Sequence, residues 1–309
     1  MKLLKPMLPT LASQIPSGDD WQYEVKYDGF RALIYVTETE TKLISRNHNL
    51  LNRQFPEIVD FFESLSNQIK IAPYIIDGEL CVLETGIKAR FDLIQKRGRL
   101  KNIEKIKNAQ KSSPVTFMAF DILMTNGHLQ TKKPLHERKK LLQELFNGLN
   151  TDQKYFLEVF SYSHGENLWT EIKKGHGEGI VAKHKNSLWK EGTRSIQWLK
   201  IKNLQTATLF VLGYDQANGF FHVGCLDNIE IKMIGKVGQG FSKEEKEALI
   251  TIVKKNQTKV LQSIIYINPS ICIDVEFLEL GKNELRHPKF LRFRFDMQWE
   301  ECSWQEIQK

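Results

Sequence analysis

The alternation of hydrophobic and polar positions predicts a chain built mainly of strands, with a few helices between them. The β-rich runs EVKYDGFRALIYV (24–36) and KLISR (42–46) flank the polar turn TETET, which indicates a hairpin. Hydrophobic residues recur at helical spacing over 53–69, with Pro56 in the first turn, and predict a helix there. Further strands are expected at 74–83, 115–124, 155–162, 179–185 and 198–202, and further helices at 91–98 and 135–146.

After Asn203 the pattern changes to short strands around one helix. The strand-like runs cover 206–215, 220–227, 229–238, 271–280 and 290–296. The helix predicted over 242–255 begins with Ser242 and has Glu245 three residues later, which is a capping box. Five or so short strands with one helix in about 105 residues are typical of a small β-barrel such as an OB-fold. We therefore expect two domains, 1–203 and 204–309, which also suits the length.

The composition is that of a globular protein. Hydrophobic residues make up 41% of the chain and charged residues 26%, which is too apolar for a disordered chain. No uncharged apolar run approaches about 18 residues, so we expect no membrane-spanning helix. Pro6 and Pro9 interrupt the first apolar stretch, so we expect no signal peptide. The four cysteines form no C-x-x-C motif, which argues against a zinc site or a disulfide framework and fits a reducing cytoplasm.

The positive charge is concentrated in the first two thirds of the chain. Residues 1–203 hold 31 Lys+Arg and 23 Asp+Glu, a net charge of +8, whereas residues 204–309 hold 13 and 14, a net charge of −1. Within the basic part, the segment 88–111 holds nine Lys or Arg and two acidic residues. Such a segment suits a nucleic-acid phosphate backbone, and it equally suits a solvated surface loop. Charge alone leaves both interpretations open.

Lys26 in KYDGFR (26–31) is the strongest candidate for a nucleophile. A lysine amine attacks only when neutral, so burial or a nearby cation must lower its pKa. The motif K-x-D-G is weak by itself, because Asp-Gly is a common turn. Five more short segments follow it in order: SRN (45–47), IDGEL (76–80), FMAFDIL (117–123), EGIVAK (178–183) and WLKIK (198–202).

These six segments together resemble the ATP-dependent DNA ligases. That family lies within the covalent nucleotidyltransferase superfamily, which also includes RNA ligases and mRNA capping enzymes. The resemblance covers nearly the whole chain and continues through 235–241 and 285–296. It implies an α+β fold in which an ATP-grasp-like nucleotidyltransferase core of antiparallel sheets with helices is followed by an OB-fold β-barrel. It also implies that nicks with 5′-phosphate and 3′-hydroxyl ends are sealed through lysyl-AMP and DNA-adenylate.

The resemblance assigns a chemical role to each matched residue. Lys26 would attack the α-phosphorus of ATP, and Phe120 would stack on adenine from the strand face that it shares with Met118. Lys200 and Lys202 would point the same way from one strand, contact the α-phosphate, act in catalysis with Lys26 and lower its pKa. The implied ATP-binding set is Glu24, Lys26, Arg31, Arg46, Glu79, Phe120, Lys183, Arg194, Lys200 and Lys202.

Metal, DNA and pyrophosphate sites are implied in the same way. Glu178, aided by Asp28, would hold Mg²⁺ or Mn²⁺. The residues implied to contact DNA are Arg46, Arg97 and Arg99, the last two in FDLIQKRGR (91–99), which resembles a stretch of bacterial ligases. In the OB domain, Arg286, Arg294 and Asp296 would orient the departing pyrophosphate when that domain swings over the ATP. Met297 follows Asp296 where the family pattern leads us to expect a Lys, which weakens this last expectation.

Within the family, the chain resembles most the bacterial ligase-D type, the ligase module of non-homologous end joining. Only 25 residues precede Lys26, so we expect no large N-terminal DNA-binding domain. A free-standing ligase, a phage-type ligase and an excised module all remain open. The expected partner is nicked or broken duplex DNA, and the resemblance alone adds Ku and a polymerase module. We expect a monomer in the bacterial cytoplasm or nucleoid, without membrane contact.

Two other functions remain in play. An RNA ligase or an mRNA-capping nucleotidyltransferase would use the same superfamily chemistry on RNA. A nucleic-acid-binding OB protein with an inactive transferase fold is the third candidate. The presence of all five of the central residues argues against an inactive relative; they are Lys26, Glu79, Glu178, Lys200 and Lys202.

Overall fold

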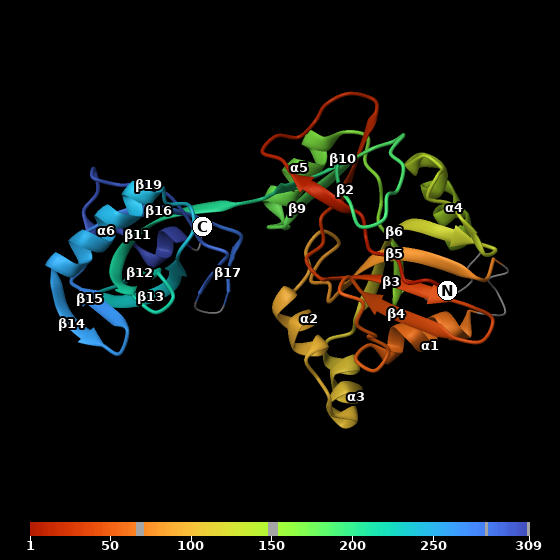
Figure 1. Cartoon of the computed structure of the whole chain (residues 1–309), viewed down its shortest axis with the longest axis horizontal. Helices are drawn as coiled ribbons and strands as arrows, with labels where there is room; N and C mark the ends of the chain where they lie inside the picture. The colour runs from red at the N-terminus through yellow and green to blue at the C-terminus, as the bar shows by residue number, and fades with distance from the viewer. Residues whose placement is uncertain (66–70, 148–153, 282–283, 308–309) are drawn as a thin grey trace. The chain divides into compact units, whose positions relative to one another are not determined.

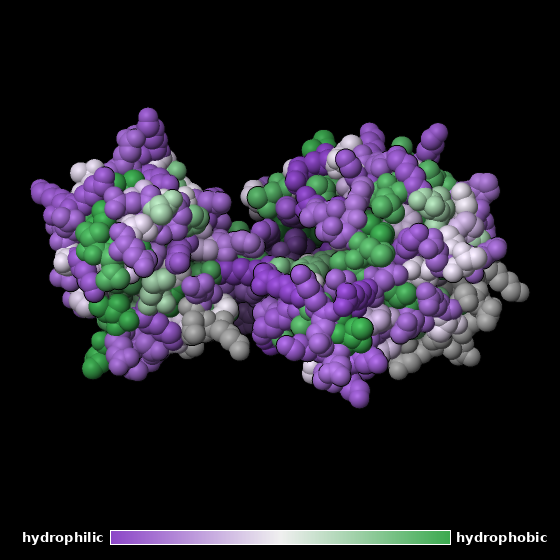
Figure 2. Space-filling model, turned by 60° about the horizontal axis from the view of Figure 1, so that its bottom comes forward, coloured by the Kyte–Doolittle hydropathy of each residue, from purple (hydrophilic) through white to green (hydrophobic). Residues whose placement is uncertain are grey.

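The chain forms two compact units, Met1–Asn203 and Leu204–Lys309, each with its own hydrophobic core. The structure is a computed structural model that describes residues 1–65, 71–147, 154–281 and 284–307 (Figure 1). Figure 2 shows hydrophilic residues over most of the visible surface, interrupted by scattered hydrophobic patches. Over the described ranges, no helix is both long and apolar enough to cross a membrane.

The first unit contains a six-stranded sheet. Its strands, in spatial order, are β4 (Thr41–Ser45), β3 (Phe30–Val36), β5 (Tyr74–Cys81), β6 (Thr116–Thr125) and β7 (His128–Leu129), with β8 (Phe156–Glu158) pairing with β6. One face of this sheet packs on α1 (Pro56–Ser64) and α4 (Leu135–Asn147). Phe117 belongs to the core on that face and Phe120 to the core on the other face, which confirms the alternation expected for β6.

A four-stranded sheet provides the second half of this unit. Its spatial order is β1 (Leu8–Leu11), β10 (Arg194–Lys202), β9 (Gly179–His184) and β2 (Trp21–Val25), and α5 (Gly165–Lys174) packs on it. The β-rich run 24–36 is therefore divided: Lys26–Gly29 separate β2 from β3, which belong to different sheets. The hairpin of β3 and β4 is confirmed. The hydrophobic pattern predicted neither β1 nor α5.

Most of the basic segment 88–111 is helical, so the interpretation as a surface loop is wrong, and the helix predicted over 91–98 is confirmed. After α2 (Phe91–Gly98), the residues Ile103–Ser112 form α3, whose N-terminus is capped by the Asn102 side chain accepting from the Lys105 amide at 3.1 Å. The capping residue was present in the sequence, but the many lysines obscured the helical spacing of the few apolar residues. The helix predicted over 53–69 ends at Ser64, and residues 66–69 lie outside the described ranges.

Arg97 is a structural residue, which corrects its assignment to DNA binding. Its side chain is 2% exposed, and its Nη2 donates to Glu57 Oε1 at 2.7 Å. Its Nη1 donates to the carbonyl oxygen of Ser113 at 2.8 Å. These bonds join α2 to α1 and to the end of α3. A guanidinium that is buried and paired in this way cannot reach a DNA backbone.

The second unit is a β-barrel with helices at its surface, as expected for an OB-fold. The strand order is β13 (Glu230–Val237), β12 (Phe220–Asp227), β11 (Gln205–Asp215), β15 (Ile264–Ile267) and β14 (Gln257–Leu261), and β16 (Cys272–Phe277) pairs with β11 and β19 (Lys289–Phe293). The smaller elements are β17 (Glu279–Leu280), β18 (Leu285–Arg286), η1 (Trp299–Glu301) and α7 (Trp304–Ile307). Helix α6 (Lys243–Lys255) begins with the predicted capping box. The mainly exposed strand β14 and its partner β15 were not predicted.

Candidate active site

A cavity of about 110 Å³ lies between the two sheets of the first unit. Val25, Val181 and Trp198 line it from the four-stranded sheet. Six residues of the predicted ATP-binding set also line it: Glu24, Lys26, Arg31, Glu79, Phe120 and Lys183. The sequence segments that suggested a common site are thus brought together, although they lie on two different sheets.

Lys26 lies directly after β2, beside the carboxylate that the sequence assigns to a metal. Its amide donates to the carbonyl oxygen of Gly179 at 2.9 Å, and its Nζ lies 2.5 Å from Glu178 Oε2. Gly179 has φ +148°, and a Cβ there would overlap the carbonyl oxygen of Ile201. Only glycine therefore allows β9 to approach β10 this closely and to hold Glu178 against Lys26.

The expected lowering of the Lys26 pKa is wrong. Burial, the largest single cause, lowers this pKa, but Glu178, Glu79 and Asp28 together raise it above its usual range. The lowering is found at Lys200, where burial is the largest cause and the neighbouring Lys26 ammonium adds to it. Lys26 is therefore an ammonium paired with a carboxylate, and it must lose a proton before it can attack as a nucleophile.

The ring of Phe120 makes cation–π contacts with two side chains. The Arg31 Cζ lies 4.4 Å from the ring centroid and the Lys183 Nζ lies 4.3 Å from it, both within the range of cation–π contacts. A buried carboxylate holds each cation. Arg31 donates to both oxygens of Asp77, at 2.6 and 2.7 Å, and Lys183 lies 2.5 Å from Glu24 Oε2. The Phe120 ring therefore lies in the cavity in contact with two cationic side chains, and adenine stacking on it stays a prediction.

Glu79 has an unusual protonation state. Burial raises the pKa of this carboxyl to about 8, although Arg31 and Lys26 oppose the rise. The folded protein therefore binds a proton that the unfolded chain, with a carboxyl pKa of 4.5, releases between pH 4.5 and about 8.

Stability should fall across that interval as the pH rises. Relative to a Glu79→Gln variant, the wild-type free energy of unfolding is expected to decrease by on the order of a few kcal/mol between pH 5 and pH 8, because the cost of ionising the buried carboxyl grows. Urea denaturation at several pH values measures this difference. Glu63→Gln, at an exposed position of α1, is the matched control. A pH-independent difference for Glu79→Gln would contradict the assigned protonation.

The remaining members of the predicted set lie outside the cavity lining. Ile201 packs on the side of the sheet that α5 covers, so the flanking Lys200 and Lys202 project from its other face, as the alternation predicted. Arg46 is exposed, and its amide donates to the carbonyl oxygen of Arg31 at 3.0 Å. The exposed Arg194 donates from Nη1 to the carbonyl oxygen of Pro9 at 2.7 Å. The structure thus brings Arg46 and Arg194 to the rim of the site but not into it.

Glu178 and Asp28 fit a magnesium site with few protein ligands. Burial raises the pKa of Glu178, and Asp28 raises it further against the opposing effect of Lys26. The described residues contain no group of three or more His, Cys, Asp or Glu that could hold a metal. Mg²⁺ commonly takes one or two carboxylates, with waters and substrate phosphate oxygens completing its shell. Two carboxylates beside a cavity that Lys26, Arg31 and Lys183 line are compatible with that coordination.

Three residues that contact Arg31 or line the cavity were not predicted from the sequence. Asp77 is fully buried and holds Arg31; it lay unassigned inside the segment IDGEL. Trp198 lines the cavity, and only its membership of WLKIK pointed to it. The carbonyl oxygen of Met7 accepts a bond from Arg31 Nη2 at 3.2 Å, although the proline-rich N-terminal segment gave no signal of this contact.

The OB residues assigned to pyrophosphate have partners within their own unit. Arg286 Nη1 donates to Glu279 Oε1 at 2.9 Å. Arg294 donates to both oxygens of Asp296 at 2.8 Å, and its Nη1 lies 3.2 Å from Asp274 Oδ1. The Arg294–Asp296 pair fixes the orientation of this guanidinium, and any anion that it binds must compete with these carboxylates.

Two family models match the chain. The ATP dependent DNA ligase domain matches residues 6–202, and the ATP dependent DNA ligase C terminal region matches residues 215–297. The chain belongs to the ATP-dependent DNA ligases. The first match includes every residue of the cavity, and the second includes the three OB residues discussed above. The family and the fold suggested by the sequence motifs are therefore confirmed.

Individual ligases show how far the similarity extends. The bifunctional non-homologous end joining protein LigD of Bacillus subtilis (strain 168) is 36% identical over 97% of this chain and 51% of its own length. A DNA ligase of Methanocella arvoryzae is 28% identical over 97% of this chain and 57% of its own length. The chain spans about half the length of these curated relatives.

Solved structures share the fold. The ligase domain of M. tuberculosis LigD has a TM-score of 0.57 at 24% identity, and 97% of each chain is covered. A Lig E DNA ligase described as a minimal scaffold has a TM-score of 0.63 at 21% identity, over 93% of this chain and 99% of its own.

Proposed function

We propose that this ATP-dependent ligase domain seals nicks in duplex DNA through a lysyl-AMP intermediate and a DNA-adenylate. The observation that carries the proposal is the position of Lys26, which lines one cavity together with Arg31 and the ring of Phe120 and is paired with Glu178. Residues 1–203 would act as the nucleotidyltransferase domain and residues 204–309 as the OB-fold domain.

The chemistry begins when the Lys26 amine attacks the α-phosphorus of ATP. A nitrogen–phosphorus bond forms, the bond to the β-phosphate oxygen breaks, and pyrophosphate leaves. Lys26 must first lose both its proton and its pairing with Glu178, because that pairing raises its pKa. Lys200 and Lys202 then stabilise the charge that develops on the α-phosphate, and Phe120 orients adenine by stacking. Bound Mg²⁺ or Mn²⁺, held by Glu178 and Asp28, would supply further positive charge at the phosphate.

The test uses ATP and GTP labelled on the α-phosphate. The chain is incubated with either nucleotide and Mg²⁺, and nicked DNA or nicked RNA is then added. We expect label to pass from ATP to protein and to be released as sealed DNA forms. Labelling by GTP alone would support the capping-type alternative, and sealing of RNA alone would support an RNA ligase; either result would contradict a DNA ligase.

The exposed basic surface of α2 and α3 is the proposed contact for the DNA backbone. With Arg97 buried, the exposed cations of this surface are Lys96, Arg99, Lys101, Lys105, Lys107 and Lys111. Figure 1 shows α3 at the lower end of the first unit, beside α2. Arg46, exposed next to Arg31, is the proposed contact for the 5′-phosphate of the nick.

Removing exposed charge from this surface should weaken DNA binding. Arg99→Ala combined with Lys105→Ala is expected to weaken nick binding several-fold and to lower the slope of log K against log [salt] by about 0.9 for each lost phosphate contact. Fluorescence anisotropy with a nicked duplex at several salt concentrations measures both quantities. Lys174→Ala, an exposed site on α5, is the matched control. An unchanged slope would contradict DNA contact and would show that this basic surface is only solvated.

The relative from Bacillus subtilis carries non-homologous end joining in its name, and we propose that role in DNA repair for this domain. Its DNA partner would then be a broken or nicked duplex, with Ku and a polymerase module as further partners. A bacterial cytoplasmic location is supported by four buried cysteines that are all free thiols.

A further inference from the structure

Trp198 forms one wall of the cavity and contacts both Lys183 and Phe120. The Lys183 Nζ lies 4.4 Å from the centroid of its ring, and the Phe120 ring meets it edge to face at 6.5 Å. The orientation of this indole therefore decides where the Lys183 ammonium lies relative to Phe120. The position of the indole depends in turn on a contact outside the cavity.

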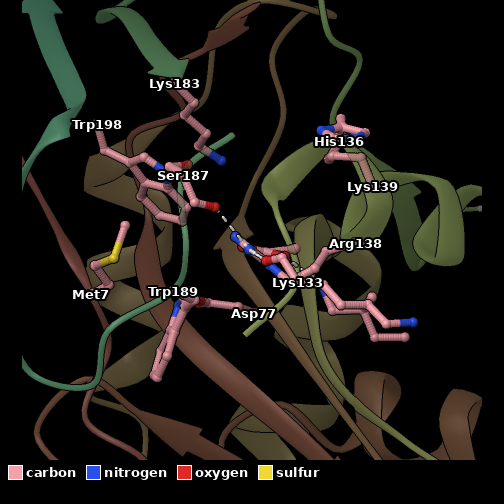
Figure 3. Close-up of polar contacts among 12 residues, drawn as sticks. Met7, Asp77, Lys133, His136, Arg138, Lys139, Lys183, Ser187, Trp189 and Trp198 are labelled. Atoms are coloured by element: carbon pink, nitrogen blue, oxygen red, sulfur yellow. Dashed lines mark hydrogen bonds and ion pairs between the residues drawn. The ribbon is translucent and has the colours of Figure 1, made fainter. Parts of the chain in front are cut away.

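The indole is held by a serine that does not line the cavity. Trp198 Nε1 donates to Ser187 Oγ at 3.0 Å, and Trp198 is 1% exposed while Ser187 is fully buried. An indole N–H is a donor only, so it has to find an acceptor when it is buried. Ser187 is the partner that the structure provides for it, and Figure 3 shows Ser187 between Trp198 and Arg138.

The serine itself is fixed from two sides. Arg138 Nη1 donates to the carbonyl oxygen of Ser187 at 3.0 Å, and the Ser187 amide donates to the carbonyl oxygen of His184 at 2.9 Å. Arg138 is fully buried and is bound to both oxygens of Asp121, the residue after Phe120 in β6. A continuous set of bonds thus runs from the strand that carries Phe120 to the acceptor of the Trp198 indole.

The same loop also reaches the second cation on Phe120. Trp189, two residues after Ser187, donates from Nε1 towards Asp77 Oδ2 at 3.4 Å, and Asp77 is the bidentate partner of Arg31. The backbone amide of Trp189 donates to the carbonyl oxygen of Thr131 at 3.1 Å. Loop residues 185–189 therefore support both cations of the adenine-binding surface from outside the cavity.

We propose that Ser187 is a positioning residue for nucleotide binding, which fixes the Trp198 ring against Lys183 and Phe120 through its hydroxyl group. This inference rests on the proposed function, because it assigns the cavity to ATP. Ser187→Ala leaves a buried indole N–H without an acceptor, so the ring is expected to turn towards another acceptor and to displace Lys183.

The experiment measures binding of α,β-methylene-ATP, which cannot be cleaved between its α and β phosphorus atoms, to the full chain by calorimetry. Ser187→Ala is expected to raise the Kd about tenfold, because a displaced indole no longer holds Lys183 in the position that the nucleotide meets. Ser195→Ala is the matched control, because it removes a nearby hydroxyl that accepts from the Gln197 amide at 3.1 Å and does not contact the indole. Its Kd should equal that of the parent chain.

A double-mutant cycle separates positioning through the indole from general structural support. Trp198→Phe keeps an aromatic ring but removes the N–H, so Ser187→Ala should have no further effect on the Kd in that background. Additive effects would overturn the route through Trp198, and an unchanged Kd for Ser187→Ala would overturn the inference alone. A parent chain that does not bind the analogue would overturn the proposed function and this inference with it. If Ser187→Ala does not fold, the Kd of Trp198→Phe provides the test. An unchanged Kd for Trp198→Phe would contradict a role for the indole N–H.

Discussion

Lys26→Ala is expected to abolish the protein-AMP adduct. The reaction needs an amine at this position to form the nitrogen–phosphorus bond, and alanine has no group that could replace it. The cavity should still bind ATP, because Phe120, Arg31 and Glu79 remain in place. Protein labelling by ATP that carries the label on its α-phosphate measures the first step, and calorimetry with the uncleavable analogue measures binding.

One control variant and one further substrate sharpen this result. Lys174→Ala removes an exposed lysine of the same unit and should label like the parent chain. A nick supplied already adenylated does not need the amine as nucleophile, so Lys26→Ala is expected to retain some sealing of that substrate. Persisting label on the Lys26→Ala protein would show that another residue is the nucleophile.

Arg138→Ala is expected to cause the largest loss of stability among single substitutions in the first unit. Arg138 and Asp121 form a bidentate pair in which both side chains have 0% exposure. Removing the guanidinium leaves a buried carboxylate without its counter-charge, which costs about 3–5 kcal/mol. It also removes the donor to the carbonyl oxygens of Lys133 and Ser187. The denaturant midpoint of the first unit, followed by tryptophan fluorescence, gives the change.

An uncompensated buried charge predicts a specific order of stability among variants. Asp121→Asn combined with Arg138→Ala should be more stable than Arg138→Ala alone, because the uncompensated charge is gone. Arg99→Ala, at an exposed arginine, should change the free energy of unfolding by less than about 0.5 kcal/mol. A double variant that is less stable than Arg138→Ala would show that lost packing, and not buried charge, is the main cost.

The sequence predicted those parts of the fold in which local pattern and burial agree. Helix α6 has a capping box and a regular apolar spacing, and β6 is a continuous apolar run, so both were found. Strand β1 pairs in parallel with β10, which lies more than 180 residues later, and Pro9 within it obscures any local strand pattern. Helix α3 was missed because only Ile106 of its residues is buried, so little periodicity marks it.

The site was predicted by residue type and order, but its partners were not. Lys26, Glu79, Phe120 and Lys183 meet in one cavity as the motifs indicated. The pKa of Lys26 could not be predicted, since it depends on a contact with Glu178 that forms only when β9 lies beside β2. Burial likewise decides between two uses of the same side chain: Arg97 and Arg99 look alike in the sequence, and only the second is exposed.

The burial of Arg97 also changes how many ions this protein can exchange with its surroundings when it binds DNA. Arg97 has its counter-charge in Glu57, Arg90 is bound to Asp92 at 2.9 Å, and Lys88 lies 3.4 Å from Glu84. These cations have carboxylate partners already and displace few sodium ions from a phosphate backbone. The number of counterions released when this segment binds DNA is therefore expected to be smaller than its nine basic side chains suggest.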